Sequence, residues 1–327
     1  MNNTIKVIAE AGINHNGNFK KAIKLVKIAK MANADYVKFQ LFKTENFINK
    51  EFKHTRINYK KVFKRFKSLE FSAQEWKKII AYGNKIGIKV FFSIFDFESL
   101  RIIKKLQIKL VKIASGEINN FPLLKKIKEQ NLKVILSTGM SSLSEIKNAI
   151  KKLNKNNLTL MHCMSEYPTV RPNLNNIKYL KDKFKIPVGY SDHTEDILTP
   201  ALSVIAGANI IEKHFTYNKK QKIGDHKFSL LPNELKKMIE NVKFAEHSLG
   251  SKKNSITKKE RNLKFFARRG LYLNKDKFKG QKVTASDIDI LRPEGYLPVD
   301  KIKIIKNKKL KVDIKKYQKI KKSYFKR

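Results

Sequence analysis

The sequence has a single cysteine, Cys163, and so cannot form an internal disulfide bond. Its hydrophobic runs are short and broken by polar residues, which excludes a bilayer-spanning helix. The first residues, MNNTIKVIAEAG, lack the basic start and long apolar core of a secretion signal. Together these absences predict a cytoplasmic protein in a reducing compartment, with no contact with the membrane.

Acidic residues are also scarce. The chain has 28 Asp and Glu and 72 Lys and Arg, which gives a net charge of +44. Such an excess alone would suggest a polyanionic partner. The lysines, however, are spread over nearly every segment, often at helical spacing as in KKAIKLVKIAK. We interpret them as a solvated surface and predict no specific nucleic-acid partner.

Short apolar runs that end in polar or glycine-rich residues recur along the chain. We expect these runs to be strands, and most of the stretches between them have the apolar spacing of amphipathic helices. The runs are Ile5–Ala9, Tyr36–Phe39, Lys89–Phe92, Leu110–Ala114, Val134–Leu136, Leu158–Met161, Val188–Gly189 and Ala208–Ile211. The repeated pattern predicts an α/β fold, a (β/α)8 barrel. A doubly wound open sheet is the alternative, but it would usually have fewer strands.

The pattern divides the chain into three parts. Residues 1–250 carry the strand and helix repeats and are predicted to form the barrel. Residues 251–264, which begin with SKKNSITKKERN, are polar and are predicted to be a linker. Residues 265–327 change to short strand patterns with turns, which predicts a small, mostly β domain.

Two histidines follow the last two apolar runs. His193 lies in YSDHT and His214 in EKHFT, each close to a carboxylate, Asp192 or Glu212. In parallel α/β folds, catalytic and ligand-binding residues lie beyond the carboxyl ends of the strands. Two imidazoles on neighbouring strand ends can bind one divalent metal and leave positions open for substrate. Each histidine could instead merely cap a strand, but a matched pair favours the metal.

Two lysines, Lys38 and Lys112, lie inside apolar runs, where a charge is costly unless an anion meets it. Either lysine could pair with Glu10 or Glu117. Hydroxyl side chains stand at the ends of the same and neighbouring runs, namely Ser93, Ser115, Ser137 and Ser191. If the barrel forms, these lysines and serines converge, and together they indicate a phosphate pocket.

Eight motifs carry a family resemblance: AEAGINHNG, KFQLFKTENF, KIASGE, STGM, HCMSEYP, YSDHT, EKHFT and GDHKFS, in this order. In these motifs the chain resembles the sialic acid synthases, and its RPEGYLP region resembles their antifreeze-like (SAF) domain. The resemblance covers nearly the whole chain. It implies a (β/α)8 barrel followed by a SAF domain, assembled as a domain-swapped homodimer.

The resemblance also implies an activity, that of a C–C bond-forming transferase. Phosphoenolpyruvate and an N-acetylated hexosamine would condense with water to a nine-carbon 2-keto sugar acid and phosphate. N-acetylmannosamine, giving N-acetylneuraminate, is the first choice of acceptor. A 2,4-diacetamido-2,4,6-trideoxy-mannose, giving N,N'-diacetyllegionaminate, is the alternative, and the pseudaminic acid branch fits AEAGINHNG less well.

The same resemblance implies the roles of single residues. His193 and His214 would bind a divalent metal, Mn²⁺ in the first place, with Mg²⁺ or Co²⁺ as alternatives. Glu10 and Glu117 would be catalytic. Phosphoenolpyruvate would contact Lys38, Ser93, Lys112, Ser115, Ser137 and Ser191. The sugar would face Gln40, Tyr167, Asp225 and Arg292, the last reaching in from the partner subunit.

Three turns depart from the family pattern. The turn after the third run reads Phe92-Ser93-Ile94 and lacks a proline. The Gly224-Asp225 turn lacks the proline between its glycine and its aspartate, and the arginine turn reads Arg292-Pro293-Glu294.

A different class of function would be a catalytically inactive barrel that binds polyanions or carbohydrates. The intact histidine pair and both buried lysines argue against that class, because an inactive barrel has no reason to keep them.

Overall fold

The computed structural model describes residues 4–221, 224–250 and 254–326. The chain forms two compact units, residues 1–250 and residues 251–327. Each unit has a hydrophobic core of its own. Across the described ranges, no helix is long and apolar enough to cross a membrane.

Eight parallel strands close into a barrel in the first unit. They are β1 (Lys6–Gly12), β2 (Tyr36–Leu41), β3 (Lys89–Ile94), β4 (Leu110–Ile113), β5 (Lys133–Ser137), β6 (Leu158–His162), β7 (Val188–Asp192) and β8 (Ile210–His214). Each strand pairs with the next along the chain, and β8 pairs back onto β1. The predicted (β/α)8 barrel is therefore confirmed, and the open sheet is excluded.

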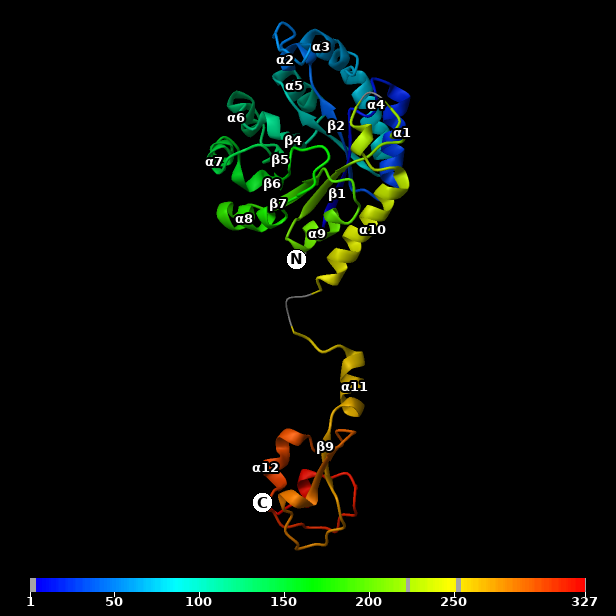
Figure 1. The fold of residues 1–327 in the computed structure, drawn as a ribbon, viewed down its shortest axis with the longest axis vertical. Helices are drawn as coiled ribbons and strands as arrows, with labels where there is room; N and C mark the ends of the chain where they lie inside the picture. The colour runs from blue at the N-terminus through cyan, green and yellow to red at the C-terminus, as the bar shows by residue number, and fades with distance from the viewer. Residues whose placement is uncertain (1–3, 222–223, 251–253, 327) are drawn as a thin grey trace. The chain divides into compact units, whose positions relative to one another are not determined.

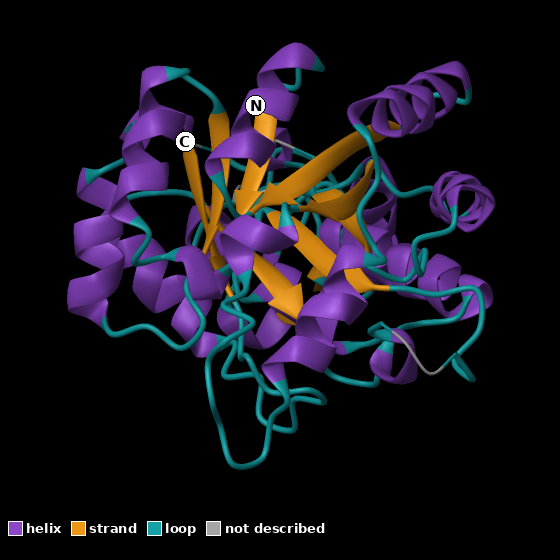
Figure 2. Ribbon diagram, turned by 90° about the horizontal axis from the view of Figure 1, so that it is seen from above, coloured by secondary structure: helices purple, strands orange, loops and turns teal. Residues whose placement is uncertain are grey.

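Helices surround the strands, as Figures 1 and 2 show. They are α1 (Phe19–Met31), α2 (Thr44–Phe47), α3 (Tyr59–Lys67), α4 (Ala73–Lys85), α5 (Phe97–Lys105), α6 (Phe121–Glu129), α7 (Leu143–Lys151), α8 (Asn175–Phe184), α9 (Thr199–Ile205) and α10 (Pro232–Ser248). Short 3-10 turns, η1 (Ser115–Glu117), η2 (Lys155–Asn157) and η3 (His226–Phe228), lie in the loops between these elements.

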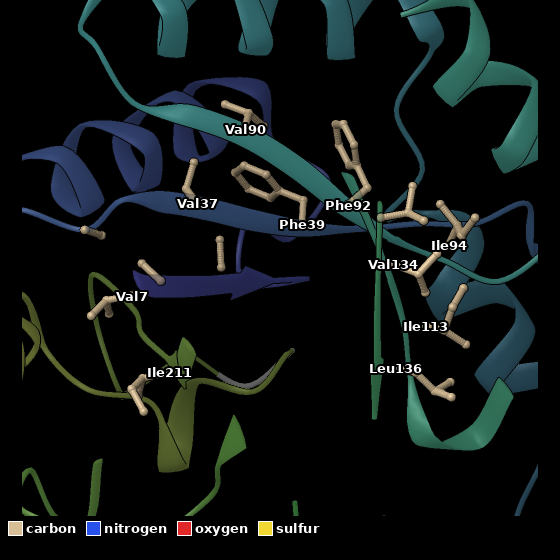
Figure 3. Packing of buried hydrophobic residues seen from close by; sticks show 14 of the residues in the cluster. Val7, Val37, Phe39, Val90, Phe92, Ile94, Ile113, Val134, Leu136 and Ile211 are labelled. Atoms are coloured by element: carbon tan, nitrogen blue, oxygen red, sulfur yellow. The ribbon is translucent and has the colours of Figure 1, made fainter. Parts of the chain in front are cut away.

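The main core lies between the strands and the surrounding helices. Because successive strand side chains point to opposite faces, alternate residues such as Val37 and Phe39 of β2 face the helices. Figure 3 shows them with Val90 and Phe92 of β3 in the same cluster, all of them buried. Burying such a side chain contributes about 1.5–3 kcal/mol each, so this layer holds the barrel together.

Strands β7 and β8 run further than the apolar pattern predicts, to Asp192 and His214 rather than Gly189 and Ile211. Their last residues are polar, and the apolar pattern ends where they begin. The backbone ladder continues through them because it does not depend on side-chain polarity, pairing Ser191 with Glu212. Both strand ends therefore enter the mouth of the barrel as rigid strand.

Helix α7 begins at a capping box. Its cap is Ser142, whose side chain accepts a hydrogen bond from the Glu145 N–H. The Glu145 carboxylate in turn accepts one from the Ser142 N–H, and this reciprocal pair fixes the first turn.

The second unit contains α11 (Lys258–Ala267), β9 (Gly270–Leu273), β10 (Ile288–Leu291) and α12 (Ile302–Ile305), with 3-10 turns η4 (Ala285–Asp287), η5 (Val299–Lys301) and η6 (Lys322–Tyr324). Residues 251–264, predicted as a linker, include the first part of α11, which begins at a Thr257–Glu260 capping box. Strands β9 and β10 form an antiparallel pair, and isolated bridges such as Tyr272–Lys319 supplement it. The unit packs around residues such as Leu273, Val283 and Ile305.

Candidate active site

The interior of the barrel has an apolar layer and, above it, a polar layer. The apolar layer contains Ile8, Phe91, Ile135, Met161 and Ile210, one residue from each of five strands. Two residues further along four of these strands the inward-facing side chains are polar, because the side-chain period of a strand is two. This polar layer contains Glu10, Lys38, Ser93, Lys112, Ser137, Ser191 and Glu212, all buried. Six of these seven residues were predicted from the sequence as site residues.

A cluster of four charged side chains lies at the centre of this layer. Lys38 Nζ is 2.9 Å from Glu10 Oε2 and 3.5 Å from Glu212 Oε2. Lys112 Nζ donates a hydrogen bond of 2.8 Å to Glu212 Oε1. Two cations thus face two carboxylates at the floor of the mouth, so either lysine can exchange a carboxylate for an anionic ligand. The alternative pairing of a lysine with Glu10 is realised, whereas no Glu117 pairing is seen among the described residues.

Burial and charge set opposite pKa shifts for the two carboxylates. Burial raises the pKa of Glu10 to about 7, with Lys38 opposing the shift. Burial also disfavours the charge on Glu212, but Lys112 and Lys38 outweigh it and hold the pKa of Glu212 below its usual range. One carboxyl group is therefore set to exchange a proton near neutral pH, and the other stays ionised.

Glu212 was not among the predicted site residues. A signal was available, because Glu212 lies two residues before His214 on β8 and must share its inward face. The Ser191 hydroxyl also donates a 3.0 Å hydrogen bond to Glu212 Oε1. Glu212 therefore connects the lysines to the strand that carries His193.

The two histidines lie side by side, with ring centroids 5.7 Å apart. His193 Nδ1 is 2.6 Å from the Met164 carbonyl oxygen, which accepts its proton, so that the lone pair lies on Nε2, 3.5 Å from Ser191 Oγ. His214 Nδ1 is buried without a hydrogen-bond partner among the described residues, and lies 3.7 Å from Asp225 Oδ2. Burial lowers the pKa of both imidazoles, so both are neutral at pH 7.

This donor set fits a divalent transition metal. Neutral imidazoles bind divalent transition metals, and carboxylate oxygens such as those of the nearby Asp225 are the ligands that suit Mn²⁺. A buried imidazole nitrogen without a partner would gain one on binding. In the described part of the chain no group of three or more His, Cys, Asp or Glu side chains is arranged as a complete metal cage. His193 and His214 remain the predicted ligands.

Three of the predicted site residues lie close to one another around Gly12. Its φ is +52°, a conformation that favours glycine. A Cβ at this position would lie 3.3 Å from Glu10 Oε1, 3.4 Å from Asp225 Oδ2 and 3.6 Å from Gln40 Nε2. The fold thus brings Glu10, Gln40 and Asp225 together around one glycine.

Asn14 attaches the loop after β8 to the loop after β1. Its Nδ2 donates to the Phe215 carbonyl at 2.8 Å and to Ser229 Oγ at 3.1 Å. Its Oδ1 accepts the Asp225 N–H at 2.8 Å. Asn14 is completely buried, and it determines where Asp225 lies. The sequence indicated Asn14 only as a polar residue after a strand.

Two aromatic rings cover the histidine pair. The Tyr167 ring lies 4.2 Å from the ring of His193, centroid to centroid, and 4.9 Å from that of Phe228. Phe228 in turn lies 5.5 Å from the ring of His214. The mouth therefore has an apolar wall opposite the charged cluster. Tyr167 was predicted to face the sugar, whereas Phe228 was not singled out.

The remaining predicted residues lie at the rim or elsewhere. Ser115 and Glu117 form η1, where Ser115 Oγ is 3.2 Å from Ser165 Oγ and Glu117 accepts a 2.9 Å hydrogen bond from Asn120. Burial raises the pKa of Glu117. Arg292 follows β10 in the second unit and is exposed. Its role stays a prediction.

The fold and this site define a class: a (β/α)8 barrel whose polar side chains converge at the carboxyl ends of the strands, where barrel enzymes carry their chemistry. Residues 25–254 match the sequence profile of the NeuB family. The chain belongs to this family.

Relatives with stated functions are similar over most of their length. An N,N'-diacetyllegionaminic acid synthase of Campylobacter jejuni is 40% identical over 88% of this chain and 90% of its own. One of Legionella pneumophila is 36% identical over 95% and 92%. The solved structure of an N-acetylneuraminic acid synthetase from Leptospira borgpetersenii has a TM-score of 0.73 at 34% identity, and the match covers 80% of this chain and 90% of that one.

Proposed function

We propose that this protein condenses phosphoenolpyruvate with an N-acetylated hexosamine and water, giving a nine-carbon 2-keto sugar acid and phosphate. The observation that carries the proposal is the buried Lys38 and Lys112 in the same barrel mouth as the His193 and His214 pair. Membership of the NeuB family, whose relatives are named as synthases of such acids, supports it.

In this proposal the lysines bind the anionic ends of phosphoenolpyruvate. Lys38 already donates a 2.7 Å hydrogen bond to Ser93 Oγ, and Lys112 lies 2.8 Å from Glu212 Oε1. A phosphate or carboxylate would replace part of the present carboxylate contacts and gain hydrogen bonds from serine hydroxyls. Its contacts would be Ser93, Ser115, Ser137 and Ser191 in addition to the lysines.

His193 and His214 would hold the divalent metal, Mn²⁺ being favoured. When bound, the metal supplies Lewis-acid polarisation of the aldehyde oxygen of the open-chain sugar. Glu10, with its pKa raised to about 7 by burial, is suited to hold or release a proton there. Glu117 is the second candidate, because burial raises its pKa as well.

The proposed bond changes balance in atoms and protons. C3 of phosphoenolpyruvate forms a bond to the aldehyde carbon, and the aldehyde oxygen takes up a proton. Water adds to C2, and the bond between C2 and the bridging oxygen breaks to release phosphate and leave the keto group. The lysines hold the phosphate and the carboxylate of phosphoenolpyruvate throughout, so this positioning contributes much of the rate enhancement.

For the acceptor, Gln40, Tyr167 and Asp225 are the proposed contacts. The relatives at 40% and 36% identity carry the name of N,N'-diacetyllegionaminic acid synthases. They favour a 2,4-diacetamido-trideoxy-hexose over N-acetylmannosamine, the first choice from the sequence. The proposal includes the second unit as a SAF domain that contributes Arg292, in a homodimer.

The test is phosphate release by the full chain with Mn²⁺, phosphoenolpyruvate and each acceptor in turn. We expect release only when an N-acetylated hexosamine is present, fastest with the diacetamido sugar. His193→Ala and His214→Ala should abolish both release and Mn²⁺ binding, whereas the exposed His247→Ala serves as the matched control and should retain both. Release without any acceptor, or full turnover after chelation, would contradict the proposal.

A further inference from the structure

A buried ion pair lies on the outer face of the barrel, outside the site described above. Asp192 of β7 and Lys213 of β8 are direct partners across the two strands. Because side chains alternate, they face away from the interior that Ser191 and Glu212 enter. Each residue is only 1% exposed, although lysine and aspartate are almost never fully buried unless they are paired.

Apart from the Tyr190 hydroxyl of β7, the hydrogen-bond partners of this pair all belong to Thr194, in the turn that contains His193. Asp192 Oδ1 accepts from the Tyr190 hydroxyl at 2.8 Å and from the Thr194 N–H at 3.1 Å. Asp192 Oδ2 accepts from Thr194 Oγ1 at 2.9 Å and from Lys213 Nζ. Lys213 Nζ also donates to the Thr194 carbonyl at 2.6 Å. The residues on both sides of His193 are therefore fixed.

His193 itself is held at its backbone and ring. Its carbonyl oxygen accepts the Thr169 N–H at 2.8 Å, and its Nδ1 faces the Met164 carbonyl at 2.6 Å. With Asp192 and Thr194 anchored, the backbone of His193 is fixed, and the contact with Met164 sets the direction of its imidazole.

A general gain in stability does not explain the pair well. Taking two charges out of water costs about as much as their attraction returns, and apolar residues of the same volume would often do equally well. Side chains that do not touch a metal themselves, in contrast, commonly orient a histidine ligand and set its tautomer.

We propose that Lys213 and Asp192 are positioning residues that orient His193 from outside the barrel and thereby set the affinity of the histidine pair for a divalent metal. This inference rests on the proposed function for the metal itself. The orientation of His193, however, can be measured without any metal.

The first measurement is Mn²⁺ affinity of the metal-free full chain, by electron paramagnetic resonance of free Mn²⁺. We expect Lys213→Met and the isosteric Asp192→Asn to bind Mn²⁺ about 10- to 100-fold more weakly. Phosphoenolpyruvate affinity, measured by calorimetry, should stay within about twofold of wild type, because Lys38 and Lys112 lie on β2 and β4 and Ser191 faces the opposite side of β7 from Asp192. The matched control is Asp35→Asn, which removes the ion pair of Lys6 with Asp35 at the opposite end of the barrel, and should leave Mn²⁺ affinity unchanged.

The second measurement is the tautomer of His193, from ¹⁵N spectra of the imidazole assigned with His193→Gln. We expect one tautomer with the proton on Nδ1 in the wild type and a mixture in Lys213→Met and Asp192→Asn. Wild-type Mn²⁺ affinity and an unchanged tautomer in both variants would overturn the inference, as would equal losses of Mn²⁺ and phosphoenolpyruvate binding. A wild type that binds no Mn²⁺ would refute the proposed metal, and the tautomer would then decide the positioning role alone.

Discussion

At the scale of single residues, the mouth of the barrel balances buried charge in a way that suits an anionic ligand. Lys38 contacts both Glu10 and Glu212, and Lys112 contacts Glu212. Burial opposes the charge on Lys38, but the two carboxylates outweigh it and raise its pKa. Burial dominates at Lys112 and lowers its pKa. Lys112 shares its carboxylate partner, Glu212, with Lys38, so an incoming dianion would give Lys112 a further negative partner.

Replacing either lysine should weaken phosphoenolpyruvate binding. A hydrogen bond to a charged group contributes about 1.5–3 kcal/mol, which corresponds to about 10- to 150-fold in affinity. We expect Lys38→Met and Lys112→Met each to show a loss in this range by calorimetry. Lys89→Met, at the exposed start of β3, is the control and should bind like wild type. Unchanged affinity in both site variants would mean that the anion binds elsewhere.

Much of this residue layer could be predicted from local sequence patterns. Asn14 and Phe228 could not, because they reach the site from loops. Lys38 and Lys112 could be found because a charge inside an apolar run is costly, and Ser137 and Ser191 because they stand at the ends of such runs. Asn14 was missed because it contacts a segment about 200 residues away in sequence, with a 2.8 Å bond to the Phe215 carbonyl, and Phe228 because it meets His214 and Tyr167 from a loop. No periodicity encodes such a contact.

At the scale of elements, the two loops after β1 and β8 form one unit at the barrel mouth. Asn14 joins them at Phe215, Asp225 and Ser229. His226 reinforces the junction, because its Nε2 lies 3.2 Å from Asn16 Oδ1 in the first loop. The position of Asp225 therefore depends on a residue of the first loop.

Asn14→Ala should loosen the loop after β8 without disturbing the charged cluster. Three hydrogen bonds are lost, and buried partners are left unpaired, at about 1–3 kcal/mol for each unsatisfied group. We expect faster amide hydrogen exchange in residues 224–230 and a higher acceptor KM, with phosphoenolpyruvate affinity unchanged. Asn84→Ala, on the exposed face of α4, should leave all three unchanged. Wild-type exchange in residues 224–230 of Asn14→Ala would show that the loop is held by other contacts.

Element boundaries show a second limit of the sequence pattern. The predicted starts of all eight strands lie within two residues of the observed ones, because buried apolar runs are unambiguous. The ends of β7 and β8 were predicted too early, since polar residues interrupt the apolar pattern without ending the strand. The predicted linker includes part of α11 because a polar, lysine-rich sequence can be helical when it is capped.

At the scale of the whole molecule, the chain consists of two units with separate cores. The second unit relies on one buried carboxylate. Asp287 is 2% exposed and contacts Lys275 Nζ at 2.8 Å, Lys277 Nζ at 2.7 Å and the Thr284 N–H at 2.8 Å. Burial opposes its charge, but these hydrogen bonds outweigh burial and hold the pKa of Asp287 well below its usual range.

This shift predicts acid sensitivity of the second unit. Because the folded pKa lies below the unfolded value of about 3.9, the stabilisation is fully present above about pH 4 and is lost as the pH falls below it. We expect the protection of amides in residues 270–325 of the full chain, measured as the exchange rate relative to unprotected amides at the same pH, to fall below pH 4. Asp287→Asn should exchange faster already at pH 7 and show less pH dependence. A variant with the wild-type acid profile would contradict this role for Asp287.

The central claim for the whole molecule is a condensation in which the C–O bond of phosphoenolpyruvate breaks. Phosphoenolpyruvate labelled with ¹⁸O at the bridging position, incubated with the full chain, Mn²⁺ and the preferred N-acetylated hexosamine, tests it directly by mass spectrometry of both products. We predict that the label appears in the released phosphate and that a nine-carbon 2-keto sugar acid forms in equal amount. Unlabelled phosphate, or phosphate released without the sugar acid, would contradict the account.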